Sequence, residues 1–438
     1  MTNSKASKEK LSYYTSLGIN TDSKYFRRHY RRGLLNEIDI DYVKEIQEYY
    51  RKHLNRTIDP VTHIAYANLT GMKDVRIIPQ EFFRKDILKM FNDYLMTDIY
   101  RDKALYDLMF DTEKQAYTVI KRVRGQYYNH DNVTISVSEV FNILNDDSEE
   151  YIIKPTDTNN GIGIKKIKVE NRKLYIDDNL VTKDFLDSEY GYNFVVQRII
   201  KQHENLAYPH PSSVNTLRMV TIRWKNKIEN LYTFARFGHS GDIKDNAGSG
   251  GVVVGVKDDG SFMDYGIQAS KFIYEHPTTK IKISELKNVP NFEEAKKFVR
   301  ELHSKVLHHN YVAWDITIDE NGNPVFIEAN FFGSSWVNQI ALQEPMFRCK
   351  TEEILEFIAE NREKVNQLDI KSLAKKRNSR ARRERRKLSE RVEELEQKLV
   401  IKKEKLKKLK KINRLNKEEI KRIKNSKSWR YTQIFRKI

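Results

Sequence analysis

Residues 311–330 read YVAWDITIDENGNPVFIEAN and carry the strongest fold signal in the chain. Two apolar runs flank the segment DENGN, whose turn chemistry predicts a β-hairpin. The hairpin would bring Asp315 beside Glu328 and Asn330, three oxygen ligands of the kind that Mg²⁺ prefers. A plainer interpretation makes Asp315 a strand-edge charge and Asn330 a turn residue. Glu328 and Asn330 nevertheless lie in a markedly apolar segment, where a charge needs a partner or marks a site.

A second informative stretch, residues 151–169, reads as a strand, a glycine-bearing turn and a partner strand. Lys154 ends the first strand, and Asn159-Asn160-Gly161-Ile162-Gly163 forms the turn. Gly161 and Gly163 permit a backbone whose N–H groups face phosphate oxygens, and Lys154 is placed to neutralise a phosphate. An ordinary turn with a surface lysine fits the same residues. The chain has no GxxxxGK[ST] motif, so it is not a P-loop enzyme.

Between these stretches, the apolar run at residues 216–224 predicts a strand that contains Arg218. An arginine inside a strand can clamp a phosphate or a carboxylate with two N–H groups. For Arg223 and Arg236 a solvent-facing position is equally consistent with the pattern. Gln197 would lie where another apolar strand leaves the core.

Length, composition and charge bound the class of protein. The 438 residues suffice for two or three domains, and no run of 18 or more apolar residues predicts a membrane span. The N-terminus lacks the apolar core of a signal peptide. The single cysteine, Cys349, excludes an intramolecular disulfide and multi-cysteine metal sites, and we expect a reduced thiol of a cytoplasmic protein.

The net charge of +18 is concentrated in one segment. Residues 371–438 hold 28 Lys and Arg against eight Glu, which gives +20, so the remaining residues carry −2. The body and the tail therefore need separate explanations.

The motifs that follow one another along the chain resemble those of an ATP-grasp enzyme: Lys154 with its glycine hairpin, Gln197, Asn215 to Arg218, Asp315, and Glu328-x-Asn330. The chain is most similar to the sugar-transfer-associated ATP-grasp proteins found with surface-polysaccharide synthesis genes. The similarity covers roughly residues 60–360.

The resemblance implies an α+β fold in which two subdomains clamp ATP. With the periodicity of the flanking regions, the expected parts are a helical N-terminal region at 1–58, an ATP-grasp N-terminal subdomain at 59–150, a nucleotide- and Mg-binding core at 151–362, and a basic coiled-coil tail at 372–438. Elsewhere we expect helices near 24–34, 39–53, 82–95, 102–110, 138–145, 182–188, 293–308 and 351–361.

The resemblance also implies roles for individual residues. The positions matching nucleotide contacts are Lys103, Lys154, Gly161, Gly163, Gln197, Ile199 and Ile200. The lysines would contact phosphates, the glycines would lie in the lid loop, and the amide of Gln197 with main-chain groups of the isoleucines would bind adenine. Many relatives have glutamate where this chain has Gln197. Lys103 has an open alternative, a solvent lysine beside a helix-capping Asp102.

The remaining matches concern catalysis and the metal. Arg218 and Lys154 would be catalytic, with Arg218 neutralising the γ-phosphate and an acyl-phosphate, while Asp315, Glu328 and Asn330 would hold one or two Mg²⁺, or Mn²⁺ instead. The implied reaction is an ATP- and Mg²⁺-dependent ligation of a carboxylate to an amine (or another nucleophile) of a cell-surface glycan precursor, yielding ADP and phosphate. A kinase of a sugar or small metabolite is the alternative within the same fold. The flexible segment 246–251 is a candidate lid over the acceptor, or simply a hairpin turn.

The tail has three candidate partners. Leu388, Val392, Leu395, Leu399, Leu406, Leu409, Ile420 and Ile423 follow coiled-coil spacing, interrupted by Lys402, Asn413 and Asn416. The basic run at 375–387 resembles part of a basic-region leucine zipper, so a nucleic-acid-binding protein is the alternative of a different class. The cations with Trp429 and Phe435 also suit attachment to an anionic membrane at the cytoplasmic face, and Ser428-Trp429-Arg430 resembles the tails of some polysaccharide glycosyltransferases. We expect membrane or partner docking rather than specific DNA binding.

Overall fold

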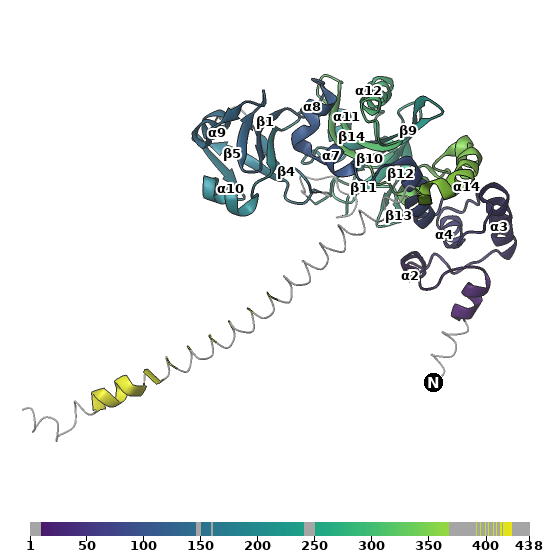
Figure 1. Cartoon of the computed structure of the whole chain (residues 1–438), viewed down its shortest axis with the longest axis horizontal. Helices are drawn as coiled ribbons and strands as arrows, with labels where there is room; N and C mark the ends of the chain where they lie inside the picture. Colours follow the sequence, from purple (N-terminus) through teal and green to yellow (C-terminus); the bar gives the residue numbers. More distant parts are fainter. Residues whose placement is uncertain are drawn as a thin grey trace, which may run out of the picture. The chain divides into compact units, whose positions relative to one another are not determined.

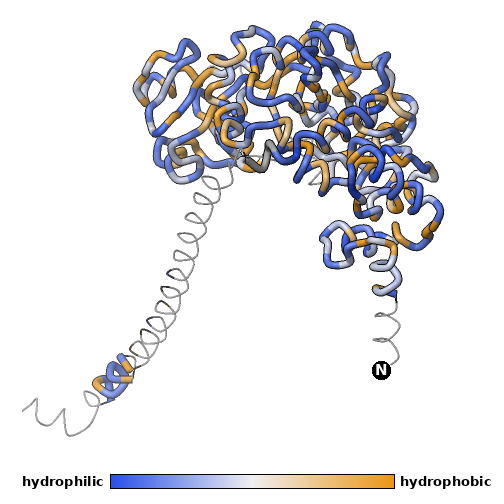
Figure 2. Tube along the Cα trace, turned by 45° about the vertical axis from the view of Figure 1, so that its right-hand side comes forward, coloured by the Kyte–Doolittle hydropathy of each residue, from blue (hydrophilic) through white to orange (hydrophobic). Residues whose placement is uncertain are grey.

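The computed structural model describes residues 10–145, 150–158, 161–240 and 250–367, and in the tail 391, 395, 399, 402, 406, 409, 412, 413 and 415–422. By its contacts the chain divides into two units, Met1–Asn366 and Gln367–Ile438. The first unit contains helices and two antiparallel sheets, as predicted (Figure 1). Apolar and polar residues alternate in short stretches along this unit (Figure 2). In the described part of the chain no helix is both long and apolar enough to span a membrane.

The smaller lobe of the first unit is built on an eight-stranded sheet in which each described neighbouring pair runs antiparallel. In spatial order its strands are β3 (Thr134–Ile135), β2 (Gln126–Asn129), β1 (Thr118–Val123), β8 (Phe194–Arg198), β4 (Tyr151–Pro155), β5 (Lys165–Glu170), β6 (Lys173–Ile176) and β7 (Asn179–Leu180). The helices α9 (Val137–Leu144) and α10 (Lys183–Glu189) pack on its apolar face through Val140, Leu144 and Leu186. The predicted hairpin of β4 and β5 across the glycine turn is confirmed.

The larger lobe is built on a seven-stranded antiparallel sheet. Its order is β13 (Lys271–Ile273), β12 (Phe262–Gln268), β11 (Val252–Val256), β10 (Lys227–Phe237), β9 (Thr216–Trp224), β14 (Tyr311–Ile318) and β15 (Pro324–Asn330). The predicted hairpin of residues 311–330 is confirmed as β14 and β15, with an irregularity after Asp315. Asp319 closes its turn by accepting the N–H groups of Asn321 and Asn323.

The two faces of this sheet are covered by different helices. On one face α12 (Phe292–Ser304) buries Ala295, Phe298, Val299 and Leu302 against the strands, at the helical spacing visible in the sequence. On the other face lie α13 (Ser335–Leu342), α14 (Thr351–Gln367) and the N-terminal helices α2 (Lys24–Arg31), α3 (Ile40–Leu54) and α4 (Val61–Thr70). One continuous apolar core joins these N-terminal helices to the sheet.

Short helices connect the N-terminal region to the two sheets. They are α5 (Gln80–Phe82), a π-helical turn η1 (Phe83–Ile87), α6 (Leu88–Phe91), α7 (Thr97–Arg101), the 3₁₀ turn η2 (Lys103–Leu105) and α8 (Tyr106–Phe110). A single helix over 82–95 was expected, but the helical run ends at Phe91 because Asn92 is extended and its side chain binds the carbonyls of Tyr311 and Phe331. The remaining short helices are α11 (Glu204–Ala207), η4 (Ile283–Glu285) and η5 (Arg348–Lys350).

In the second unit, the described positions are helical. The apolar residues among them are exposed by about half of their surface, from 50% at Leu415 to 62% at Leu409. Leu388, Val392, Ile423, the basic run 375–387 and the segment Ser428–Phe435 lie outside the described residues, so the coiled coil remains a prediction.

Candidate functional site

The candidate site is centred on Asp315, a carboxylate in the middle of β14 that is only 1% exposed. Arg218 lies directly opposite on β9 and binds Asp315 with two N–H groups, one of them Nη2 at 2.9 Å from Oδ2. Arg236, one strand farther on β10, donates from Nη2 to the same Oδ2 at 3.0 Å. The central position of β9 between β10 and β14 brings both guanidinium groups to one carboxylate.

The charges of Asp315 and its two arginines are mutually dependent. Burial alone would raise the pKa of Asp315, but Arg218 and then Arg236 outweigh it, so the pKa lies below its ordinary value. Asp315 is therefore ionised at neutral pH. The sequence left open whether Arg236 faces the solvent or the site, and its interaction with Asp315 shows that it faces the site. Arg223, by contrast, binds carbonyl oxygens at the end of α12, including those of His303 and Val306.

The second carboxylate, Glu328, is the cross-strand partner of Asp315 in the hairpin. Asn330 joins them, because its Nδ2 lies 3.2 Å from Asp315 Oδ2 and 3.2 Å from Glu328 Oε1. Burial and then the neighbouring Asp315 raise the pKa of Glu328, while Lys103 opposes the rise. Two adjacent carboxylates, one buried and one partly exposed, repel one another, and a cation between them would remove that repulsion.

The donor set fits Mg²⁺. Two carboxylates and a side-chain amide offer hard oxygen ligands, with the amide turned so that its oxygen faces the ion, and Mg²⁺ usually keeps several waters beside one or two protein carboxylates. Among the residues that the structure describes, no group of three His, Cys, Asp or Glu side chains is placed to hold a metal. A site of two carboxylates, a side-chain amide and water is consistent with this.

Lys103 connects this cluster to the smaller sheet. Asp102 caps the turn by accepting Ala104 N–H, as the plainer interpretation expected. Lys103 itself, however, is only 7% exposed, and its Nζ lies 3.9 Å from Glu328 Oε2. The same Nζ donates to Thr158 O at 2.9 Å, just after β4. One cation thus reaches both the metal-ligand candidates and the chain that leads into the glycine turn.

Lys154 and Gln197 share one face of the smaller sheet. Lys154 pairs with Val195, and Gln197 with Ile152, so both side chains point away from the apolar core that contains Ile153 and Val196. Lys154 is 9% exposed. Lys103 lies beside the end of β4, because its backbone N–H donates to Thr156 O and its Nζ donates to Thr158 O.

The glycine turn is conformationally constrained. Gly161 and Gly163 have φ angles of 68° and 76°, a region that favours glycine. A Cβ on Gly163 would also lie 2.7 Å from Pro155 Cγ, so the turn packs directly against the residue after Lys154. Asn159 and Asn160 lie outside the described residues, as do positions 246–249 of the candidate acceptor lid.

The expected adenine-binding segment follows β8. The amide of Gln197 donates to Thr118 Oγ1 at 3.0 Å and to Ala116 O at 3.4 Å, while its Oε1 is buried without a hydrogen-bond partner among the described residues. Such an orphaned acceptor fits an amino group of a ligand. The N–H of Ile199 is already bonded to Glu150 O at 2.9 Å, whereas that of Ile200 makes no backbone hydrogen bond to another described residue. The geometry therefore favours Ile200 for reading a base.

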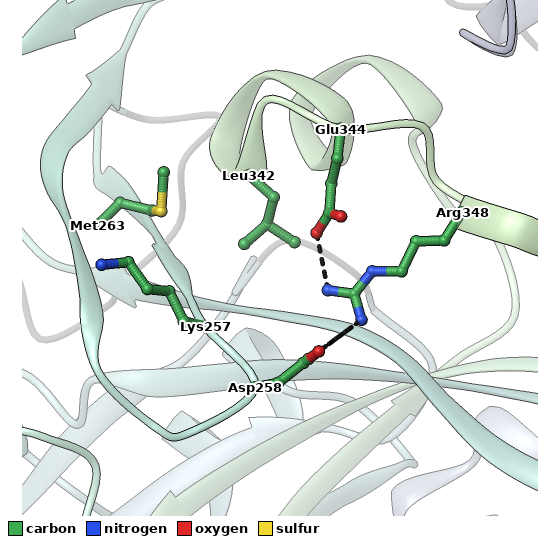
Figure 3. Close-up of a pocket in the computed structure, with 6 residues that line it drawn as sticks. All are labelled: Lys257, Asp258, Met263, Leu342, Glu344 and Arg348. Atoms are coloured by element: carbon green, nitrogen blue, oxygen red, sulfur yellow. Dashed lines mark hydrogen bonds and ion pairs between the residues drawn. The ribbon is translucent and has the colours of Figure 1, made fainter.

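A separate pocket lies away from these residues. It has a volume of about 370 Å³ and is lined by Lys257, Asp258, Met263, Leu342, Glu344 and Arg348 (Figure 3). Arg348 lies between the two carboxylates, 3.0 Å from Asp258 and 2.7 Å from Glu344, and with Lys257 the charges of the lining sum to zero. None of the candidate site residues lines this pocket.

A family model described as sugar-transfer associated ATP-grasp matches residues 83–354 of the chain. No curated protein matches the chain.

Solved structures show weak likeness. D-alanine–D-alanine ligase from Bacillus anthracis is 12% identical with a TM-score of 0.35, over 66% of this chain and 76% of that one. L-amino acid ligase from Bacillus licheniformis is 10% identical with a TM-score of 0.32, over 68% and 54%. The biotin carboxylase domain of 2-oxoglutarate carboxylase from Hydrogenobacter thermophilus, solved with MgADP, ADP and bicarbonate, is 12% identical with a TM-score of 0.32, over 58% and 48%. Likenesses at this level support no conclusion on activity.

Proposed function

The chain belongs to the sugar-transfer-associated ATP-grasp family, and on this basis we propose that it is an ATP- and Mg²⁺-dependent ligase. It would join a carboxylate to an amine in the synthesis of a cell-surface glycan precursor. The observation that carries the proposal is the cluster of Asp315, Glu328 and Asn330, which Lys103 connects to the glycine turn of the smaller sheet. The substrate class rests on the family's description.

In this proposal ATP lies between the two sheets. Lys154 and Lys103 neutralise phosphate oxygens, and the backbone at Gly161 and Gly163 covers them. The orphaned Oε1 of Gln197 accepts from the adenine amino group, and the N–H of Ile200 donates to the ring. Lys103 and Gln197 are already held by hydrogen bonds to Thr158 and Thr118, which lowers the cost of binding.

The second part of the proposed site binds the metal ion. Asp315, Glu328 and Asn330 would hold Mg²⁺, which when bound neutralises charge on the phosphates during transfer. Arg218 uses two of its N–H groups on Asp315 and has further donors that can face the γ-phosphoryl group. Arg236, held by Thr216 Oγ1 at 3.0 Å, adds a second cation on the same face.

The reaction proceeds in two balanced steps. A substrate carboxylate oxygen attacks the γ-phosphorus, the bond to the bridging oxygen breaks, and ADP leaves with an acyl-phosphate remaining. An amine then attacks the acyl carbon, phosphate departs, and the nitrogen loses a proton to form the amide. The buried Lys103 and Lys154 and the partly buried Arg218 and Arg236 would stabilise the negative charge that passes through both steps.

A kinase of a sugar or small metabolite is the second candidate function, since the same phosphate-binding groups would serve a hydroxyl acceptor. The distinction lies in the products: a ligase releases ADP only when both a carboxylate and an amine are present, whereas a kinase needs one hydroxyl acceptor. Incubating the full chain with MgATP and an extract of metabolites, followed by mass spectrometry, distinguishes them by the product formed.

Lys154→Ala supplies the matched test of the site, with Lys227→Ala, at the exposed start of β10, as the control. The first variant should weaken ATP binding and turnover together, and the second should change neither. Equal activity in both would remove Lys154 from the site. A product formed without ATP consumption would exclude the ligase and the kinase alike.

For the tail we propose docking to an anionic membrane surface at the cytoplasmic face, or to a glycosyltransferase partner. Its surplus of 20 positive charges supports this, because each basic residue near an anionic surface contributes about 1 kcal/mol. Pairing of two tails through the exposed leucines is compatible with docking. A nucleic-acid-binding protein of the basic-zipper type remains the alternative of a different class.

A further inference from the structure

A second cavity lies in the first unit, and none of the metal-ligand candidates lines it. Its volume is about 290 Å³, and it is formed where the end of α3, the π-helical turn η1, α6 and α14 meet. In the described structure no hydrogen bond or ion pair joins its lining residues to Asp315, Glu328 or Asn330. The cavity therefore needs an explanation of its own.

The lining of this cavity is strongly basic. Four cations, Arg56, Lys85, Lys89 and Arg362, face a single carboxylate, Asp86, which leaves a surplus of three positive charges. Residues outside the tail carry a net charge of −2, so the surplus does not follow from the composition of the body. Cations gathered around a concave surface attract an anion rather than simply increasing solubility.

Arg56 is held in a fixed position with one donor unused. Its Nη2 donates to Asp86 at 2.6 Å, and its guanidinium lies over the ring of Phe82, with 5.2 Å to the ring centre. Its Nε is buried and has no acceptor among the described residues. A buried N–H without an acceptor is costly, and an anionic oxygen would satisfy it.

The π-helical turn carries two of the lining residues, Lys85 and Asp86. Such turns inside α-helices are rare and occur frequently at functional sites. Lys85 pairs with Glu81, but the two side chains are 71% and 38% exposed, so this pair contributes little and leaves Lys85 able to turn to a ligand.

We propose that this cavity binds the phosphate or pyrophosphate group of a ligand that is not the ATP of the metal site. Arg56 and Arg362 supply the planar donors that match phosphate oxygens, and the two lysines add point charges. Met90 and Ile358 form an apolar wall beside them, which suits a phosphate attached to a less polar group. The proposal does not depend on the ligase activity.

Lysine acetylation read by mass spectrometry tests the proposal on the full chain, because it reports each lysine separately. Inorganic pyrophosphate should slow the acetylation of Lys85 and Lys89 several-fold and leave Lys297, an exposed residue of α12, unchanged. The exposed Arg362→Gln variant should require about tenfold more pyrophosphate for the same protection, as expected for one lost charge-assisted hydrogen bond. Lys297→Gln is the matched control.

Vesicles containing phosphatidic acid form a second arm, which distinguishes a free phosphate from a lipid headgroup. Protection of the lysines by pyrophosphate indicates a soluble ligand. Protection by vesicles alone indicates a lipid headgroup, provided that the Arg362→Gln variant loses this protection while it still sediments with the vesicles. No protection in either arm overturns the proposal. Equal protection of Lys297, or full protection in Arg362→Gln, also overturns it, since either would reflect diffuse charge screening.

Discussion

Replacing Asp315 with asparagine should destabilise the fold as well as abolish activity. The substitution keeps the shape but removes the negative charge of Asp315, which binds Arg218 and Arg236; the two arginine side chains are 17% and 15% exposed. Breaking a buried ion pair from one side costs about 3–5 kcal/mol, because the remaining charges stay buried. With an unfolding entropy of about 2.1 cal/mol/K per residue, the first unit of 366 residues should lose about 4–6 °C in Tm.

Thermal unfolding of the full chain without nucleotide measures this loss, so catalysis does not enter. Asp264→Asn, an exposed carboxylate on β12, is the matched control and should leave Tm unchanged. Adding Arg218→Gln to Asp315→Asn should restore part of the loss, because it removes one uncompensated cation. A Tm within 1 °C or so of the parent in Asp315→Asn, or no recovery in the double variant, would refute the claim that one carboxylate holds both arginines.

Four further expectations follow from the geometry. Glu328→Gln, which removes a part-exposed charge, should keep the parental Tm and lower turnover at least about 100-fold; loss of Tm without loss of turnover would make Glu328 structural. Gly163→Ala should lower the Tm more than Gly71→Ala does. Both glycines have φ near 75° (76° and 74°), but only a Cβ added at Gly163 would meet another residue, at 2.7 Å. Equal shifts in Tm would contradict this expectation. Burial lowers the pKa of His303 to about 4, so protonation of this side chain opposes folding. The free energy of unfolding should therefore be highest above the unfolded pKa of about 6.5 and should fall by about 3 kcal/mol as the pH falls toward 4. The variant His303→Gln should show a smaller decrease of Tm over the same pH range. Deleting 371–438 should leave a monodisperse body that binds ATP, whereas the full chain should sediment with anionic liposomes and be released by salt; thousandfold selection of one duplex sequence would instead make the tail a DNA reader.

The sequence predicted the hairpin at the centre of the candidate site because local chemistry determines it. The turn at 319–323 dictates the hairpin, and the hairpin dictates that Asp315 and Glu328 are cross-strand neighbours. Arg218 required only that β9 be a strand, and its place opposite Asp315 follows from the register of the sheet.

The parts that the sequence left open depend on contacts between distant segments. Arg236 reaches Asp315 across an intervening strand, and an irregularity between Asn230 and Tyr232 shifts its register, so alternation along β10 does not reveal its direction. Lys103 approaches Glu328 across 225 positions of sequence, through a short turn that only tertiary packing fixes.

The helix α4 could not be predicted from the sequence for a different reason. Its first six residues, Val61 to Tyr66, are all buried, so no polar face marks a helical period and the β-branched residues favour a strand instead. Its ends are marked by Asp59, which accepts the N–H of Val61, by Pro60, and by Gly71, which adopts a left-handed conformation. The sheet and helices around it, rather than its own pattern, determine this element.

Magnesium-dependent ATP binding is the measurement that tests the central claim most directly. Calorimetric titration of the full chain with ATP should give saturable binding with Mg²⁺ present, little binding with EDTA, and strongly weakened binding in Glu328→Gln at an unchanged Tm. ATP binding that is equally tight with and without the metal, or equally tight in Glu328→Gln, would contradict the assignment of Asp315, Glu328 and Asn330 as the site that holds the metal for the nucleotide.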